Sequence, residues 1–243
     1  MDLVNWSYVF TCIPELIPSF FKVTMVCVLV TLVVGSFFGF LLAICKLGRN
    51  KVVSHIAYAV TDVIRSVPFL VLLFLLYYAL PQLFPGLNNY SKIFFLELSL
   101  IVFASCRLSE IMRSAYEAID HNQMEASLSV GLSPVQALFH IIVPQAFHIA
   151  LPNLGNLLVG MVLETALGFT IGVYDMMGMA KLINAREYGA HNLEIYLGAA
   201  LIYWAISLII SGMTSWLEKL DKSNQHKRTP VRLASKEEQR SEY

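Results

Sequence analysis

The first long apolar run of the chain reads VTMVCVLVTLVVGSFFGFLLAIC from Val23 to Cys45 and contains no charged side chain. A run of about 20 apolar residues is long enough for a helix to cross the hydrocarbon core of a bilayer. The run therefore predicts a membrane-spanning helix.

Similar uncharged stretches recur along the rest of the chain. They are Ser66 to Ser91, Ile141 to Leu163 and Ile195 to Leu217. Of the 243 residues, 57% are hydrophobic and only 14% are charged, and the mean hydropathy is +0.64. Such a composition is too apolar for an ordinary soluble domain and indicates an integral membrane protein.

The sequence predicts an all-α, polytopic membrane protein with about five transmembrane helices. The segment from Lys92 to Arg113 carries Glu97, Arg107 and Glu110, and it is counted as a span because its omission would break the alternation of sides. The predicted spans are residues 20–45, 58–82, 92–113, 146–172 and 195–218, within a transmembrane domain of residues 1–218. Residues 219–243 are predicted to form a charged, disordered cytoplasmic tail.

The positions of the basic residues predict the orientation, because short loops rich in Lys and Arg stay in the cytoplasm. Lys46, Arg49 and Lys51 follow the first span, whereas Met1 to Phe21 contains neither Lys nor Arg. A further basic group follows Leu217 and comprises Lys219, Lys222, Lys227, Arg228, Arg232, Lys236 and Arg240. We therefore expect the N-terminus outside and the C-terminus in the cytoplasm.

Several functional classes lack a sequence signal. The 4 cysteines and 6 histidines have no metal-site spacing, so no metal site is expected. The formal net charge is zero and the one basic cluster, in the tail, is mixed with acids, so nucleic-acid binding is not expected. No G-x-x-x-x-G-K-[ST] loop is present, so the chain is not expected to bind ATP itself.

A polar segment between the third and fourth predicted spans has the marks of two short helices. Asn122 with Glu125, and Ser133 with Pro134 and Gln136, are typical of capped helix starts, and Gly131 between them indicates a turn. Apolar residues recur there at helical spacing, namely Met124, Leu128, Leu132, Val135, Leu138 or Phe139, and Ile142. This stripe fits a helix buried beneath the bundle as well as it fits one that docks on a partner.

The same segment resembles a motif of ABC importer permeases. It reads Glu125-Ala126-Ser127, then Gly131, then Ile141-Ile142-Val143-Pro144, where that family has E-A-A, Gly and I-x-L-P. Further matches to the polar amino-acid branch of the family are Arg65-Ser66-Val67-Pro68-Phe69-Leu70, Tyr77-Tyr78-Ala79-Leu80-Pro81, Glu110-Ile111-Met112-Arg113, Ala118-Ile119-Asp120, Pro144-Gln145-Ala146 and Ala150-Leu151-Pro152-Asn153. The resemblance covers roughly residues 13 to 217.

This resemblance implies a type I ABC importer permease fold in a bacterial cytoplasmic membrane, surrounded by lipid. Residues 120–142 would form coupling helices, with Glu125, Ala126, Ser127, Gly131 and Pro144 serving attachment to a separate ATPase subunit. The implied partners also include an extracytoplasmic amino-acid-binding protein and a second permease chain, identical or homologous. ATP and Mg would be held by the ATPase, so this chain would carry no cofactor and would not be an enzyme.

Glu164 lies within the apolar stretch from Ile149 to Val173, where a carboxylate costs at least about 2.5 kcal/mol unless it is paired or faces water. The family usually reads K-D-T-S or K-D-S-S where this chain reads Leu163-Glu164-Thr165-Ala166. The resemblance implies that Glu164 faces the ammonium or cationic end of a substrate, with Thr165 adding a hydroxyl. A structural ion pair of Glu164 with Arg107 is the alternative.

Arg107 stands where the family more often has an aromatic residue. Glu110, three residues later, offers a local helical ion pair. Alternatively, Arg107 reaches the cavity and binds a substrate carboxylate through a bidentate contact. Residues from Glu194 to Trp204 resemble cystine-type permeases, so cystine or another polar or cationic amino acid is a candidate substrate.

A second function remains open on the residues alone. An ion- or proton-coupled secondary amino-acid carrier could use Glu164 and Arg107 as its relay. Internal inverted repeats would favour that carrier, and the sequence shows none. An ATP-driven amino-acid importer subunit is therefore the leading hypothesis.

Overall fold

The computed structural model describes residues 4–120 and 122–228, with side chains to residue 220, and every regular element in this part of the chain is helical. This confirms the all-α fold class. The α-helices are α1 Trp6–Ser19, α2 Met25–Leu47, α3 Lys51–Ser66, α4 Phe69–Phe74, α5 Leu80–Leu83, α6 Lys92–Glu117, α7 Asn122–Ser129, α8 Pro134–Ala137, α9 Val143–Thr165, α10 Met176–Arg186 and α11 Asn192–Arg228. Short π-helical turns are η1 Phe20–Thr24, η2 Leu75–Ala79 and η4 Leu138–Ile142, and 3₁₀ turns are η3 Pro85–Asn89 and η5 Ala166–Ile171.

Among the described residues, three helical stretches are long and apolar enough to cross a membrane. They are Trp6–Leu47, Pro134–Ile171 and Asn192–Leu220, and they contain most or all of the first, fourth and fifth predicted spans. α6 has 26 residues and a length of about 39 Å, which also suffices to cross. Because of its charged side chains, α6 is not among the three apolar stretches above. The predicted number of five spans therefore depends on counting α6 as a span.

The second predicted span, residues 58–82, is not one straight helix. α3 and α4 meet at an angle of 102°. The break follows from Pro68, because the residue before a proline is driven out of the helical region, and Val67 has extended angles of −85° and 131°. The bent pair supplies a fourth span if it is counted as one crossing.

The last helix extends beyond the predicted domain boundary. α11 continues to Arg228, so the first part of the predicted tail is helical rather than disordered. Residues 229–243, the rest of that predicted tail, lie outside the described residues.

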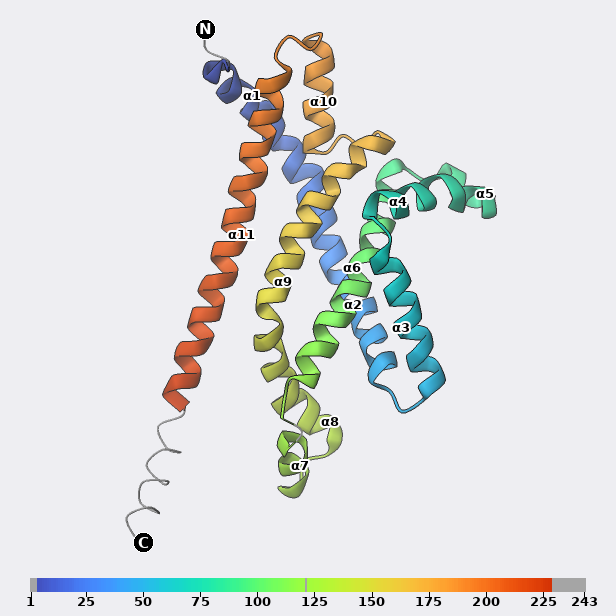
Figure 1. Ribbon diagram of the computed structural model, residues 1–243, viewed down its shortest axis with the longest axis vertical. Coiled ribbons are helices and arrows are strands. Elements are labelled where there is room, and N and C mark those ends of the chain that lie inside the picture. Colours follow the sequence, from blue (N-terminus) through green and yellow to red (C-terminus); the bar gives the residue numbers. More distant parts are fainter. Residues whose placement is uncertain (1–3, 121, 229–243) are drawn as a thin grey trace.

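α6 occupies the centre of the bundle, with α2, α3 and α9 packed around it and α11 packed on α9 (Figure 1). α2 approaches α6 closely because glycines face it. A Cβ atom on Gly39 would lie 2.8 Å from Cβ of Leu108 and 3.0 Å from the Ser105 carbonyl oxygen. Small residues let the backbones of membrane helices come together in this way.

Different helices lie at the two ends of the long axis of the molecule. α7 and α8 lie at one end of the long axis, together with the α2–α3 turn and the end of α11, whereas α1 starts at the other end, near α10 (Figure 1). The predicted topology likewise places the start of the first span at one end and the polar segment and the end of the last span at the other.

The Gly39 contact gives a stability prediction. Gly39→Ala should destabilise the folded protein by about 1–3 kcal/mol, because the added methyl forces α2 and α6 apart. The measurement is the free energy of unfolding in detergent. Gly212→Ala is the control, since a Cβ atom there meets nothing within 4 Å, and equal stability of the two variants would contradict the close packing.

Candidate functional site

The polar segment contains the two predicted helices, α7 and α8. α7 begins at Asn122, and the side-chain Oδ1 of Asp120 accepts the Asn122 backbone N–H at 3.0 Å. The predicted cap at Asn122 is therefore wrong, because Asp120 provides the capping oxygen. The i to i+2 contact is a pattern that Asp favours at turns and helix starts.

The turn after α7 is fixed by Gly131, as predicted. Gly131 has φ +89°, a left-handed conformation that glycine adopts without strain. Its N–H donates to the Leu128 carbonyl at 3.0 Å, and the Leu132 N–H donates to the Ser127 carbonyl at 3.2 Å. These two bonds form a Schellman motif, which satisfies carbonyl groups at the end of α7.

The predicted capping box at the start of α8 is confirmed. Ser133 Oγ accepts the Gln136 backbone N–H at 3.3 Å, and Gln136 Oε1 accepts the Ser133 backbone N–H at 2.9 Å. Pro134 occupies the first turn, where a missing N–H costs least. The start of α8 therefore has a defined geometry.

α8 continues into α9 through the π-helical turn η4 and without a loop. Pro144 follows this turn. Because proline has no N–H, it cannot form the regular bond to the carbonyl four residues earlier, and a wider turn accommodates the interruption. The stretch from Pro134 to Ile171 is consequently one helical unit of 38 residues.

The predicted attachment residues divide between surface and interior. Glu125, Ala126, Gly131 and Pro144 are exposed, whereas Ser127 is buried and its hydroxyl donates to the Gln123 carbonyl at 2.6 Å. Exposed apolar side chains accompany them, and we call Leu128, Val130, Val135 and Phe139 the α7–α8 surface. Much of the predicted apolar stripe therefore faces outward and is available to a partner.

Within the bundle, Arg107 and Glu164 form an ion pair between α6 and α9. Arg107 Nη1 lies 3.0 Å from Glu164 Oε1. The guanidinium lies over the Phe103 ring, 4.6 Å from its centroid, and passes Gly160, where a Cβ atom would be 3.3 Å from Nη1. The Arg107 side chain is 39% exposed and that of Glu164 15% exposed, so the pair is open to one side.

The predicted local pair of Arg107 with Glu110 is wrong. Glu110 instead binds Lys46 and Arg113, and it is contacted by Arg65. The helical spacing permits a contact with Arg107, but these cations already surround the Glu110 carboxylate.

Thr165 does not join the ion pair. It is fully buried, and its hydroxyl donates to the Val162 carbonyl at 2.7 Å. In this structure the hydroxyl predicted to contact substrate is therefore used within the helix.

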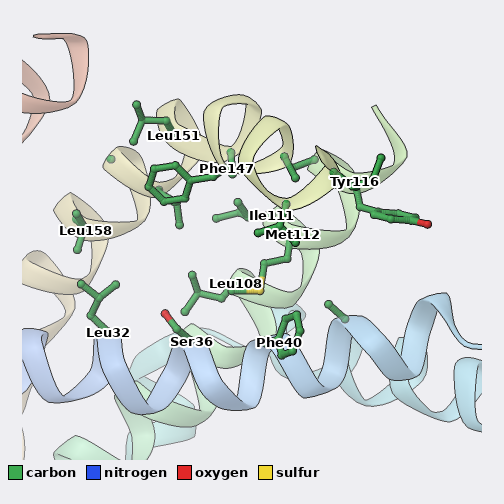
Figure 2. A pocket seen from close by; sticks show the side chains of 18 of the residues that line it. Leu32, Ser36, Phe40, Leu108, Ile111, Met112, Tyr116, Phe147, Leu151 and Leu158 are labelled. Atoms are coloured by element: carbon green, nitrogen blue, oxygen red, sulfur yellow. The ribbon is translucent and has the colours of Figure 1, made fainter. Parts of the chain in front are cut away.

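A cavity of about 770 Å³ lies between α2, α6, α9 and α11 (Figure 2). Its lining is almost entirely apolar and includes Leu32, Phe40, Met112, Phe147 and Leu158. Neither Arg107 nor Glu164 lines it, so this cavity and the ion pair are separate features.

Sequence reasoning missed a cluster near the C-terminal end of α6. The Lys46 ammonium is fully buried, 2.5 Å from Glu110 Oε1 and 2.8 Å from Ser109 Oγ. In the sequence, Lys46 served only as an orientation signal. A lysine at the end of one span and a Glu near the end of another were the available sign of a pair between helices.

Residues 35–220 match the model of a protein family described as the binding-protein-dependent transport system inner membrane component. The chain belongs to this family. The predicted resemblance to ABC importer permeases is thereby confirmed.

Curated relatives of the permease cover nearly its whole length. It is 33% identical over 222 residues to a probable amino-acid permease protein, YxeN of Bacillus subtilis, across 90% of this chain and 96% of YxeN. A probable amino-acid ABC transporter permease of Vibrio harveyi, PatM, is also 33% identical, over 90% of this chain and 97% of PatM. An L-cystine transport system permease of Bacillus subtilis, TcyL, is 30% identical over 85% of this chain and 87% of TcyL.

Solved structures share the fold of the permease. A chain in the crystal structure of an amino acid ABC transporter with histidines has a TM-score of 0.78 and 29% identity, covering 89% of this chain and 98% of that chain. A chain of the inward-facing methionine transporter MetNI has a TM-score of 0.67 and 17% identity, covering 87% of this chain and 96% of its own. The predicted permease fold is confirmed.

The capping box gives a local prediction for the permease. Ser133→Ala should cost about 1 kcal/mol of local helix stability and speed hydrogen exchange at the first amides of α8 about fivefold. Exchange measured by mass spectrometry checks this. Ser129→Ala is the control, because the Ser129 hydroxyl donates to the Glu125 carbonyl on the exposed surface of α7 and caps no helix start. An equal effect of both variants would contradict the capping role.

Proposed function

We propose that this chain is the membrane-spanning subunit of an ATP-driven amino-acid importer and that α7 and α8 couple it to a separate ATPase. The observation that carries the proposal is the construction of this segment. It is fixed by Asp120, by the Gly131 turn and by the Ser133 capping box, and it carries exposed apolar side chains. Its second helix, α8, is continuous with α9.

A rigid segment suits the transfer of motion. Amphipathic helices commonly bind by placing apolar side chains in a groove of the partner, and the α7–α8 surface offers Leu128, Val135 and Phe139 for such a groove. When the ATPases close, the segment would move as a body and carry α6 and α9 with it, which changes the side to which the path opens. ATP and Mg would be bound by the ATPase, and this chain would need no cofactor.

The ion pair between Arg107 and Glu164 supports an amino acid as cargo. An amino-acid zwitterion carries one carboxylate and one ammonium, which match the guanidinium and the carboxylate of the pair. The partial exposure of Arg107 leaves room for a ligand to approach it. Cystine is a candidate, because one relative is an L-cystine transport system permease, and so are other polar or cationic amino acids.

The remaining partners follow from the family. The description of a binding-protein-dependent system supports an extracytoplasmic amino-acid-binding protein, and the inner membrane supports a bacterial cytoplasmic membrane location. A second permease chain, identical or homologous, would complete the path, because five helices make too small a bundle to enclose an alternating cavity.

Reconstitution tests the proposal. In proteoliposomes with the cognate ATPase and binding protein, amino-acid uptake should require ATP hydrolysis. A second test measures whether the ATPase co-purifies with the permease. Phe139→Asp should abolish this co-purification, because a charge replaces an exposed apolar contact on the α7–α8 surface. Phe84→Asp, at a similarly exposed residue just after α5, should leave co-purification unchanged. Uptake driven by a proton gradient without ATPase would instead support a secondary carrier that uses Glu164 and Arg107.

The ion pair gives a substrate prediction. Arg107→Gln and Glu164→Gln should each weaken amino-acid binding to the assembled complex about tenfold or more, because each removes a charged hydrogen-bond partner. Isothermal titration of the purified complex checks this. If both variants insert normally and bind amino acid with unchanged affinity, the pair is structural.

A further inference from the structure

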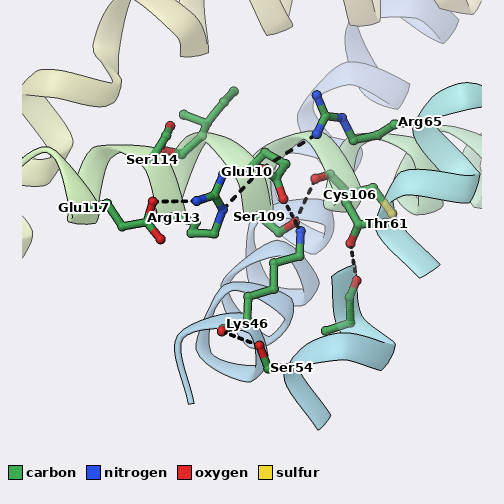
Figure 3. Close-up of polar contacts among 12 residues, drawn as sticks. Lys46, Ser54, Thr61, Arg65, Cys106, Ser109, Glu110, Arg113, Ser114 and Glu117 are labelled. Atoms are coloured by element: carbon green, nitrogen blue, oxygen red, sulfur yellow. Dashed lines mark hydrogen bonds and ion pairs between the residues drawn. The ribbon is translucent and has the colours of Figure 1, made fainter. Parts of the chain in front are cut away.

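Near the C-terminal end of α6, the Glu110 carboxylate contacts basic side chains from three helices. Its Oε1 lies 2.5 Å from Lys46 Nζ of α2, and its Oε2 lies 2.8 Å from Arg113 Nη2 of α6 and 3.7 Å from Arg65 Nη1 of α3 (Figure 3). We call Lys46, Arg65, Glu110 and Arg113 the Glu110 cluster. One carboxylate thus connects α2, α3 and α6.

The connection from α6 to α2 is fixed. The Lys46 side chain has no exposed surface, and its ammonium is also bonded to Ser109 Oγ at 2.8 Å. Removing one partner from a buried ion pair leaves an uncompensated charge, which is strongly destabilising. α2 and α6 therefore hold together as one body at this end.

The connection to α3 is of a different kind. The Arg65 side chain is 43% exposed, and its 3.7 Å separation from Glu110 is longer than a hydrogen bond. Arg65 lies in the last turn of α3, just before the 102° bend into α4. This contact can form or break without exposing a buried charge.

The cluster lies close to the coupling segment. α6 ends at Glu117, about two turns after Glu110, and Asp120 then caps α7. Arg113 joins Glu117 at 2.5 Å along this last part of α6. A displacement of α7 therefore reaches α6 next to Glu110.

We propose that Arg65 and Glu110 are positioning residues that make the bent α3–α4 pair follow the movement of α6. The inference rests on the proposed function, since it concerns how movement of the coupling segment spreads through the permease. With the contact intact, α3 moves with α2 and α6. Without the contact, the ATPase still hydrolyses ATP, but α3 and α4 do not follow the movement of α6. Fewer cycles of ATP hydrolysis then deliver a substrate molecule.

Arg65→Gln tests the proposal in the complex reconstituted with its cognate ATPase and binding protein. The measured quantity is the number of ATP molecules hydrolysed per amino acid imported. We expect this ratio to rise at least about twofold, with an unchanged thermal unfolding midpoint, and Arg65→Lys to restore it in part because the charge is kept.

Arg186→Gln is the matched control. Arg186 also forms a partly exposed ion pair between helices, with Glu15 at 2.7 Å, but it lies on α10 at the opposite end of the molecule. Its loss should leave the ratio unchanged.

The outcomes separate the two proposals. A wild-type complex without ATP-driven uptake would refute the proposed function. A coupled wild type with the same ratio in Arg65→Gln would refute the role of the Glu110 cluster alone. So would an Arg65→Gln variant that loses thermal stability while its ratio stays the same, because the contact would then be structural.

Discussion

The free-energy cost of burying charge in an apolar interior determines which helices of this permease pack against one another. α6 carries charged side chains through the middle of the bundle, and each must find a partner on a neighbouring helix or reach water. Arg107 finds Glu164 on α9, and Glu110 finds Lys46 on α2. These two ion pairs, together with the close approach of α2 at Gly39, fix the neighbours of α6 on two sides.

The features that the sequence predicted well are local ones. The capping box of Ser133 and the left-handed turn at Gly131 depend on residues within a few positions, and they appear as expected. The partner of Arg107 could not be predicted in this way, because the choice between Glu110 and Glu164 depends on which cations other helices bring to Glu110. The bend between α3 and α4 had a local sign in Val67-Pro68, but the apolar run through it favoured a single span.

The two regions with functional proposals belong to one continuous element. The part of the α7–α8 surface formed by Val135 and Phe139 lies at the start of the helical stretch whose far part carries Glu164, so the region proposed to receive force and the region proposed to hold cargo share a backbone. The family motif is concentrated at the first of these regions. At the second, this chain has Leu163 and Glu164 where the family resemblance implies Lys and Asp, so the motif itself does not name a substrate.

The length of that helical stretch has a mechanical consequence. From Pro134 to Glu164 the axis rises about 45 Å, so a tilt of only about 5° at the α8 end would displace Glu164 sideways by roughly 4 Å. That displacement exceeds the 3.0 Å that separates Glu164 from Arg107. In the movement proposed above, a tilt of this stretch relative to α6 would act through a long arm, so a small rotation would be enough to separate the two charges.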